Sequence, residues 1–340
     1  MSAPLQKWLS TTRDCGKFCT AKSGLGVFAF GSLIAIFCMA GMPSQAYAAK
    51  AKPNKAVKSA PIRTAKAAPA RARVAQSSSA RGLAHEWEPG NELKTYKKNY
   101  LLLYAYSSHP NNLPTSPNPL GQVLTPYALD NRDMKFQISL KHDIADFQEY
   151  GSLWLAYTQL VLWQYYNRSN SQPIREIYYE PEFIYSLRPS DFSLLNLGFV
   201  HQSNGEPNPR SRSWNRVYIQ PGLEIGDEGW RLVLLARWWQ RLRESALVDD
   251  NADIVNFLGY REFELRYIED ENWEISVISR IHSTQLDIAA PWSSWLALDE
   301  AYEHNINVHL HYFNGFGESL LDYNQSHVTW GVGVSFPFDN

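Results

Sequence analysis

One segment of the chain brings a histidine, a serine and an asparagine into a spacing that suits nucleophilic catalysis. His201 and Ser203 are two residues apart, and Asn215 follows after a polar stretch. In an extended strand, residues i and i+2 share a face with their Cα atoms about 6.6 Å apart, and the next strand lies about 4.8 Å away. The three side chains can therefore converge at the end of one hairpin. There the imidazole would act as general base for the hydroxyl, and the carboxamide would orient the ring.

The alternation of the surrounding residues predicts which way these side chains point. Apolar residues occupy the same face before His201 on the first strand and after Asn215 on the second. These apolar residues are Leu195, Leu197, Phe199, Val217 and Ile219. We therefore expect His201, Ser203 and Asn215 to point outward, toward lipid. Spacing alone leaves an alternative open, because His, Ser and Asn are common at strand ends and can simply meet lipid headgroups there.

The same period of two runs through most of the chain from residue 95 onward. Apolar residues alternate with polar or small ones along 134–141 and 328–336, for example, which is the pattern of a strand with two different faces. No helical stretch is long enough to cover such faces. The predicted strands are 97–106, 134–143, 152–165, 178–188, 193–203, 212–223, 230–241, 258–268, 273–283, 293–303, 306–315 and 326–337.

The predicted connections alternate in length. Segments 204–211, 242–257 and 284–292 are long, whereas 189–192 and 269–272 are short. Outer-membrane barrels have short periplasmic turns and long external loops, and closing the ring leaves no unpaired edge in hydrocarbon. We therefore predict an all-β fold: a 12-stranded antiparallel transmembrane β-barrel with its N-terminal arm and C-terminus in the periplasm. A secreted β-sandwich would need neither this rhythm nor 12 tryptophans.

Composition agrees with this class of protein. The 340 residues are 44% hydrophobic and only 19% charged, and 14% of them are aromatic. The mean hydropathy of −0.37 excludes a polytopic helical membrane protein. From residue 82 onward, 19 basic and 33 acidic residues give a net charge of −14, which argues against a nucleic-acid partner. All three cysteines precede residue 40, so the rest of the chain has no thiol chemistry.

The N-terminal region divides into two predicted segments ahead of the barrel. Residues 1–48 have the basic start, apolar centre and small-residue end (Ala46-Tyr47-Ala48) of a signal peptide. Residues 49–81 contain nine Lys or Arg and no acid, and we expect this Ala/Pro-rich arm to be disordered. It is either a solvated linker or a segment attracted to anionic lipid or cell-wall polymer. Residues 82–340 then form the predicted barrel domain.

Several stretches together resemble a known family. The block His-Gln-Ser-Asn-Gly-x5-Ser-Arg-Ser-Trp-Asn-Arg spans 201–216. Further matches are Tyr157-Thr-Gln159 with Trp163-Gln164, Arg175-Glu176 with Tyr179-Glu180-Pro181, and the run from Gly315 to Asn324. In this order and spacing they resemble the bacterial outer-membrane phospholipase A family, over roughly residues 95–338.

The resemblance implies a function and a set of site residues. It implies a calcium-dependent outer-membrane phospholipase, with A1, A2 and lysophospholipase activity, that is activated by homodimerisation. Ser203 would be the nucleophile, His201 the base and Asn215 the orienting residue, and the backbone N–H of Gly205 would bind the oxyanion.

The resemblance also implies where calcium and a second subunit bind. The calcium ligands would be the Ser211 hydroxyl, the Glu206 carbonyl and the carbonyl of the partner subunit's Ser171. The resemblance further implies that Gln159 pairs across the dimer interface. By parity it lies in an apolar, lipid-facing row where an unpaired carboxamide is costly, although the residues alone leave open a glutamine that reaches water instead.

Some features depart from the family pattern or lie outside it. Gln202 stands between the histidine and the serine, where an aspartate is common, and Glu206 occupies a position that is usually basic. His309 and His311 share a strand face with no evident carboxylate pattern, so we expect no zinc site there. The alternative function is a non-catalytic outer-membrane barrel, either a porin or a structural scaffold. The intact His201, Ser203, Asn215 and Ser211 argue against this alternative. So do inward polar residues that could fill the lumen, among them Gln137, Arg216, Glu262 and Glu264.

Overall fold

A computed structural model describes most of the chain from residue 82 onward. The described residues are 82–90, 92–227, 229–245, 248–269, 273–292 and 306–336. The predicted signal peptide (1–48) and basic arm (49–81) lie outside them. Among the described residues, no helix has the length and apolar character needed to cross a membrane.

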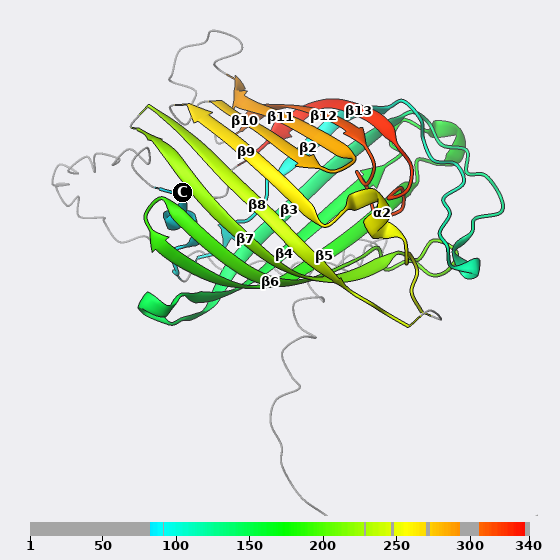
Figure 1. The fold of residues 1–340 in the computed structure, drawn as a ribbon. Helices are drawn as coiled ribbons and strands as arrows, with labels where there is room; N and C mark the ends of the chain where they lie inside the picture. Colours follow the sequence, from blue (N-terminus) through cyan, green and yellow to red (C-terminus); the bar gives the residue numbers. More distant parts are fainter. Residues whose placement is uncertain are drawn as a thin grey trace, which may run out of the picture. The chain divides into compact units, whose positions relative to one another are not determined.

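The described part of the chain is a closed, 12-stranded antiparallel β-barrel, as predicted (Figure 1). Each strand pairs with its neighbours in sequence, β13 returns to β2, and the pairing of β3 with β4 completes the ring. The short β1 (Lys94–Thr95) precedes β2 and pairs with the same strand, β3. It therefore extends the position of β2 in the ring after a short interruption. The barrel strands are β2 (Tyr100–Ser107), β3 (Arg132–Asp146), β4 (Ser152–Trp163), β5 (Ile174–Ser190), β6 (Ser193–Ser203), β7 (Ser213–Asp227), β8 (Trp230–Leu242), β9 (Arg261–Glu269), β10 (Trp273–Arg280), β11 (Ser283–Pro291), β12 (Asn307–Gly315) and β13 (His327–Ser335).

The predicted long loop at 284–292 is wrong. Residues 283–291 form β11 where we expected a long loop, and the predicted strand at 293–303 lies outside the described residues. Leu286 and Ile288 of β11 point outward while Asp287 points inward, so the segment does alternate. The many polar residues in the segment concealed that alternation. The more apolar stretch that follows it was therefore predicted as the strand instead. The connection from β10 to β11 is therefore short, although a long loop was expected after β10: it contains only residues 281 and 282.

The inner wall of the barrel is filled with paired polar side chains. The Lys97 ammonium lies 3.1 Å from Glu180 and 3.2 Å from Glu182, and Arg216 lies 3.1 Å from Glu180. The Tyr218 hydroxyl donates a hydrogen bond of 2.9 Å to Glu182. In these contacts the buried charges have partners of opposite sign, which lowers the cost of placing them inside the barrel.

Glycine allows one of these contacts to form. Gly198 of β6 is directly opposite Tyr218 of β7, and a Cβ atom on Gly198 would come within 2.2 Å of the tyrosine ring. The ring can therefore lie flat against the β6 backbone and reach across to Glu182 only because residue 198 has no side chain.

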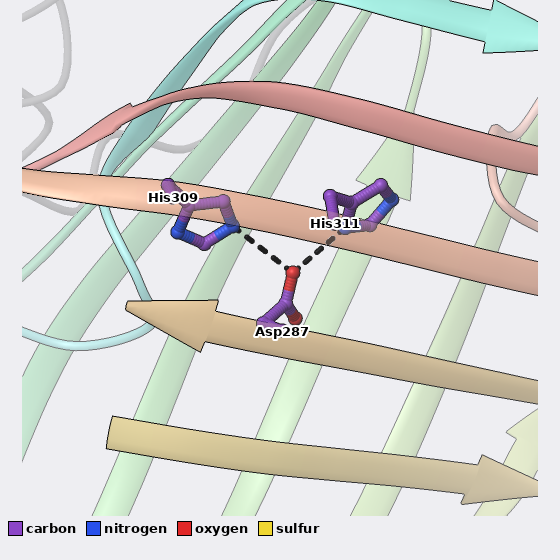
Figure 2. A group of neighbouring side chains, drawn as sticks. All are labelled: Asp287, His309 and His311. Atoms are coloured by element: carbon purple, nitrogen blue, oxygen red, sulfur yellow. Dashed lines mark hydrogen bonds and ion pairs between the residues drawn. The ribbon is translucent and has the colours of Figure 1, made fainter. Parts of the chain in front are cut away.

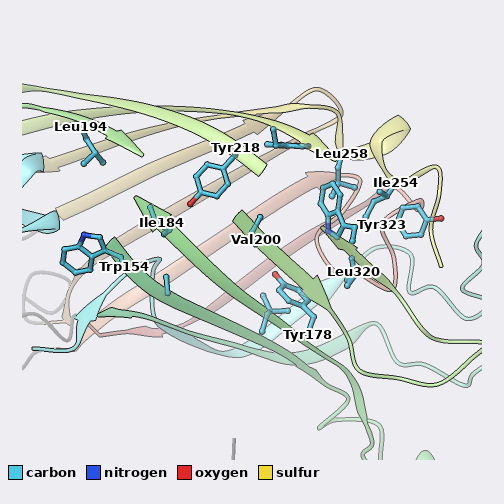
Figure 3. Close-up of a cluster of buried hydrophobic side chains, with 14 of the residues drawn as sticks. Trp154, Tyr178, Ile184, Leu194, Val200, Tyr218, Ile254, Leu258, Leu320 and Tyr323 are labelled. Atoms are coloured by element: carbon cyan, nitrogen blue, oxygen red, sulfur yellow. The ribbon is translucent and has the colours of Figure 1, made fainter. Parts of the chain in front are cut away.

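Buried apolar side chains gather toward both ends of the barrel interior (Figure 3). At the end with the short turns, the 3₁₀ helix η2 (Leu83–Trp87) packs against β5, β6 and β7, and its Trp87 ring lies 5.5 Å from that of Trp154. At the other end, the short helix α2 (Ile254–Leu258) packs with Tyr323 of the β12–β13 loop. Other short 3₁₀ turns are η3 (Pro119–Gly121), η4 (Gln148–Tyr150) and η5 (Arg168–Asn170).

Candidate active site

The hairpin of β6 and β7 brings the three predicted residues together. His201 is directly opposite Asn215 in the register, and Ser203 is opposite Ser213. The distance from His201 Nε2 to the Ser203 hydroxyl oxygen is 3.0 Å, and from His201 Nδ1 to Asn215 Oδ1 it is 2.8 Å. The spacing of two residues on one strand and one on the next thus produces an unbroken chain of hydrogen bonds.

The three side chains lie on the outer surface of the barrel. Their neighbours on this face, Phe199 and Val217, are 38% and 41% exposed, whereas Val200 and Trp214 of the opposite face are buried inside the barrel. The site therefore faces the medium that surrounds the wall. In a membrane this medium is lipid.

The hydrogen-bond partners define the chemistry of the histidine. Asn215 Nδ2 donates to Glu244 at 2.8 Å, so Oδ1 is the end of the carboxamide that faces the imidazole. The carboxamide oxygen of Asn215 can only accept a hydrogen bond, and His201 Nδ1 must therefore carry the proton. That leaves Nε2 with a free lone pair toward the hydroxyl of Ser203. This arrangement can remove the proton from the serine.

Glu244 was missed by the sequence analysis. It follows the end of β8, two residues beyond Leu242, which is opposite Asn215 in the β7–β8 register. The signal that was available is parity, since Leu242 and Glu244 continue the same strand face as it leaves the sheet.

The loop after Ser203 is held by a single buried asparagine. Asn204 accepts hydrogen bonds from the backbone N–H groups of Glu206 and Arg212, and its Nδ2 donates to the carbonyl of Arg210 at 2.8 Å. Gly205 has a φ of +63°, a left-handed conformation that favours glycine. The backbone directly after the serine is therefore fixed in a tight turn.

The residues predicted to bind calcium lie in loops at the same end of the barrel. Glu206 and Ser211 are in the loop between β6 and β7, and Ser171 is in the loop between β4 and β5. The Ser211 hydroxyl donates a hydrogen bond of 2.5 Å to the Asp250 carboxylate, which the sequence analysis also missed. Hydroxyl, carboxylate and carbonyl oxygens are the donors that calcium prefers, so this set is chemically suitable.

Gln159 lies in the same row of the barrel wall as Ser203. Gln159 of β4 is opposite Tyr179 of β5, and Tyr179 is opposite Ser203 of β6. Two strand spacings correspond to about 10 Å along the wall. The Tyr157 hydroxyl donates to Gln159 Oε1 at 3.0 Å, so the carboxamide NH₂ is turned away from that contact.

A second polar cluster lies inside the wall, on the opposite side of the barrel (Figure 2). Asp287 Oδ1 is 3.0 Å from His309 Nε2 and 2.7 Å from His311 Nδ1, so the prediction that no carboxylate accompanies these histidines was wrong. Asp287 is more than 20 residues away from both histidines in the sequence, so sequence reasoning did not connect them. His311 also contacts Glu318 at 3.3 Å, and the Lys135 ammonium lies 2.8 Å from Glu318. We interpret the cluster as part of the ionic filling of the lumen, because lysine and the imidazole N–H groups already compensate both carboxylates. Imidazole nitrogens are also poor ligands for calcium.

Comparison with known proteins supplies independent findings. A family model described as phospholipase A1 matches residues 83–336. A putative phospholipase A1 of Neisseria meningitidis serogroup B is 34% identical over 254 residues, which cover 70% of this chain and 63% of that protein. The chain therefore spans less than two thirds of that relative's length. Phospholipase A1 of Escherichia coli K12 is 31% identical over 210 residues, which cover 59% of this chain and 68% of that protein.

Solved structures agree with the fold. Outer membrane phospholipase A from Escherichia coli superimposes with a TM-score of 0.59 at 26% identity, covering 72% of this chain and 98% of that structure. A Salmonella typhi outer membrane phospholipase dimer with bound calcium has a TM-score of 0.60 at 24% identity, covering 74% of this chain and 96% of that structure. The similarity to the Salmonella typhi structure shows that the two barrels share a fold.

Proposed function

This chain belongs to the phospholipase A1 family, and from that premise we propose that it is an outer-membrane enzyme that hydrolyses the acyl ester bonds of phospholipids. The observation that carries the proposal is the hydrogen-bonded series Ser203–His201–Asn215 on the outer surface of the barrel. A hydrolase whose nucleophile faces lipid meets its substrate within the membrane. We include A1, A2 and lysophospholipase activity in the proposal, since all three cleave the same kind of ester.

The geometry suits a two-step acyl transfer. Ser203 Oγ attacks the ester carbonyl carbon while its proton passes to His201 Nε2, and Asn215 Oδ1 stabilises the imidazolium through the Nδ1–H bond. The protonated histidine then gives its proton to the leaving alkoxide, which departs as a lysophospholipid and leaves an acyl-serine. Water attacks this ester, His201 accepts its proton and returns a proton to Ser203, and a fatty acid is released.

Stabilisation of the oxyanion is assigned to the turn after the nucleophile. The fixed backbone at Gly205 lies two residues beyond Ser203, and its N–H is our candidate donor to the developing negative charge. A donor that is already in place does not have to reorganise during the reaction.

Calcium binding is the finer part of the proposal. Ser211, Asp250 and the Glu206 carbonyl would hold the ion on one subunit, and the partner subunit's Ser171 carbonyl would complete its shell. When bound, the cation supplies positive charge near the oxyanion. The calcium-bound dimer of the Salmonella typhi protein supports this assignment.

The position of Gln159 supports homodimerisation. Its carboxamide lies on the lipid-facing wall, where an unpaired amide costs roughly 2–7 kcal/mol. A partner subunit that pairs with Gln159 would cover the wall two strands from Ser203, and so would lie beside the substrate. The site would then be completed by assembly.

We also propose an orientation in the membrane. The turns between β3 and β4, β5 and β6, and β7 and β8 are short and share one end of the barrel, which we assign to the periplasm together with both termini. Ser203 lies near the opposite end, so the enzyme would act on phospholipids in the outer leaflet. The ion pairs and the buried apolar cluster that occupy the barrel interior disfavour the porin alternative.

Fatty-acid release from phospholipid–detergent mixed micelles tests the proposal. We expect wild-type protein to release fatty acid and Ser203→Ala to lose at least about 10³-fold in kcat. The matched control is Ser213→Ala, since Ser213 is directly opposite Ser203 on the same face and has no assigned role. Equal hydrolysis by wild type and Ser203→Ala would refute the assignment, and ion conductance in planar bilayers would then support the pore.

A further inference from the structure

Glu244 contacts the far end of the serine–histidine–asparagine series and has no part in the mechanism described above. We propose that Glu244 is a positioning residue: its carboxylate holds the Asn215 carboxamide in the orientation that gives His201 the productive tautomer. This inference rests on the proposed function. It adds a fourth member to the site from a strand end outside the β6–β7 hairpin.

The need for such a residue follows from the chemistry of a carboxamide. A carboxylate presents two equivalent acceptors, so either oxygen can receive the imidazole N–H. Asparagine has one acceptor end and one donor end, and rotation by 180° would place its NH₂ group against His201 Nδ1. Nδ1 would then have to accept, the ring proton would move to Nε2, and Nε2 would no longer accept the proton of Ser203.

The structure shows how this rotation is prevented. Asn215 Nδ2 donates to Glu244 Oε1 at 2.8 Å, while Asn215 Oδ1 lies 2.8 Å from His201 Nδ1. A rotated carboxamide would place its oxygen against the carboxylate, where two acceptors repel each other. Both ends of the carboxamide are thus specified, and the orientation of His201 follows from them.

The charge of Glu244 has a second consequence. Glu244 is half-buried, and no lysine, arginine or histidine within the described ranges forms an ion pair with it. Its negative charge therefore polarises the carboxamide toward the ring. It favours the imidazolium that forms when Ser203 loses its proton, because hydrogen bonds to a charged group are stronger than neutral ones.

A mutant cycle with Asn215→Asp tests this role. In the wild-type background, Glu244→Ala and Glu244→Gln should lower kcat, with about tenfold for Glu244→Ala as the expected size for an outer residue that orients a functional histidine. The KM should stay within about twofold, because Glu244 is not assigned a contact with substrate.

In the Asn215→Asp background, residue 215 needs no donor partner and its carboxylate faces Glu244. Adding Glu244→Gln to Asn215→Asp should therefore raise kcat.

Two further readouts separate positioning from general damage. Loss of the negative charge in Glu244→Gln should move the acidic limb of the kcat/KM profile to lower pH. The ¹⁵N shifts of His201 should show less Nδ1–H tautomer in Glu244→Ala, even if that variant is inactive. Arg243→Gln is the matched control, since its exposed side chain is adjacent in the same segment.

The outcomes distinguish this inference from the proposed function. Equal losses from Glu244→Gln in both backgrounds, or unchanged kcat and unchanged ¹⁵N shifts in Glu244→Ala, would overturn the positioning role while Ser203 remains essential. Hydrolysis that does not depend on Ser203 would instead overturn the proposed function itself.

Discussion

At the residue scale, the polar groups on the outer wall satisfy one another. Ser203, His201, Asn215 and Glu244 form one series in which each hydrogen bond has a donor and an acceptor of the right kind. An isolated hydroxyl or amide in hydrocarbon would cost several kcal/mol. The series lowers that cost and also fixes the proton on one nitrogen of the imidazole. A single set of contacts thus serves both the stability and the reactivity of the site.

A second residue-scale feature gives the barrel a pH dependence. Glu318, in the loop between β12 and β13, is buried, which alone would raise the pKa of its carboxyl. The opposing interactions with Lys135, His311 and His327 are stronger, and they hold the pKa of Glu318 well below its ordinary value of 4.5. The stabilisation is therefore complete above pH 4.5 and is lost as the pH falls below it toward the folded-state pKa.

We predict that Glu318→Gln lowers the free energy of unfolding at pH 7 and that this difference shrinks as the pH falls below 4.5. Urea unfolding in lipid vesicles, followed by tryptophan fluorescence at a series of pH values, measures it. Glu149→Gln is the control, because Glu149 is exposed in the turn between β3 and β4. A difference that stays constant from pH 7 to pH 3 would contradict the assignment.

At the scale of elements, the β6–β7 loop is built around the side chain of Asn204. Its three hydrogen bonds to backbone groups hold the turn that contains Gly205 and leads to Ser211. The strands place the proposed nucleophile and base, while this loop places the proposed oxyanion donor and one proposed calcium ligand. Catalysis should therefore be more sensitive to Asn204 than the fold is.

We predict that Asn204→Ala lowers kcat by about tenfold or more, because a misplaced oxyanion donor is costly. The barrel should remain folded, with a loss of unfolding free energy of about 1–3 kcal/mol from the unpaired backbone groups. Activity and urea unfolding of the same preparation measure both. Asn314→Ala, at an exposed outer position on β12, should change neither quantity. Full activity in Asn204→Ala would show that another group fixes the loop.

Much of this architecture was predictable from local pattern. Alternation identified the faces of β6 and β7, so the outward direction of His201 and Asn215 could be inferred from their neighbours. Two kinds of feature could not. Ser283–Pro291 was missed because its many polar residues concealed the alternation of its two faces. Glu244, Asp250 and Asp287 were missed because their partners are more than 20 residues away in sequence and are brought close by the pairing of neighbouring strands and by loop folding.

At the scale of the whole molecule, the inside and outside of the barrel have separate roles. Inside the barrel, η2 packs at one end and α2 with Tyr323 at the other, with ion pairs along the inner wall. This filling makes the cylinder a rigid support and leaves its outer surface to carry the chemistry. The external loops would then offer the proposed calcium ligands at the rim, where a second subunit could reach them.

We predict that calcium and assembly act together. Removing calcium with a chelator should lower activity by at least about tenfold and convert dimers to monomers, because the proposed ligands come from two subunits. Sedimentation in detergent and fatty-acid release, measured on the same samples, test this. Calcium should restore both, whereas magnesium should not, since it demands a tighter octahedral shell. Unchanged mass and activity in the chelator would contradict the proposal.

The outward direction of Ser203 and His201 also determines which measure of substrate concentration the rate of such an enzyme depends on. A lipid reaches these groups by drifting sideways within its own leaflet, without ever dissolving in water. The relevant substrate quantity is then a mole fraction in a two-dimensional fluid. Diluting the sample with buffer should leave the turnover of each embedded molecule unchanged, whereas adding inert amphiphile to the same particles should slow it in proportion.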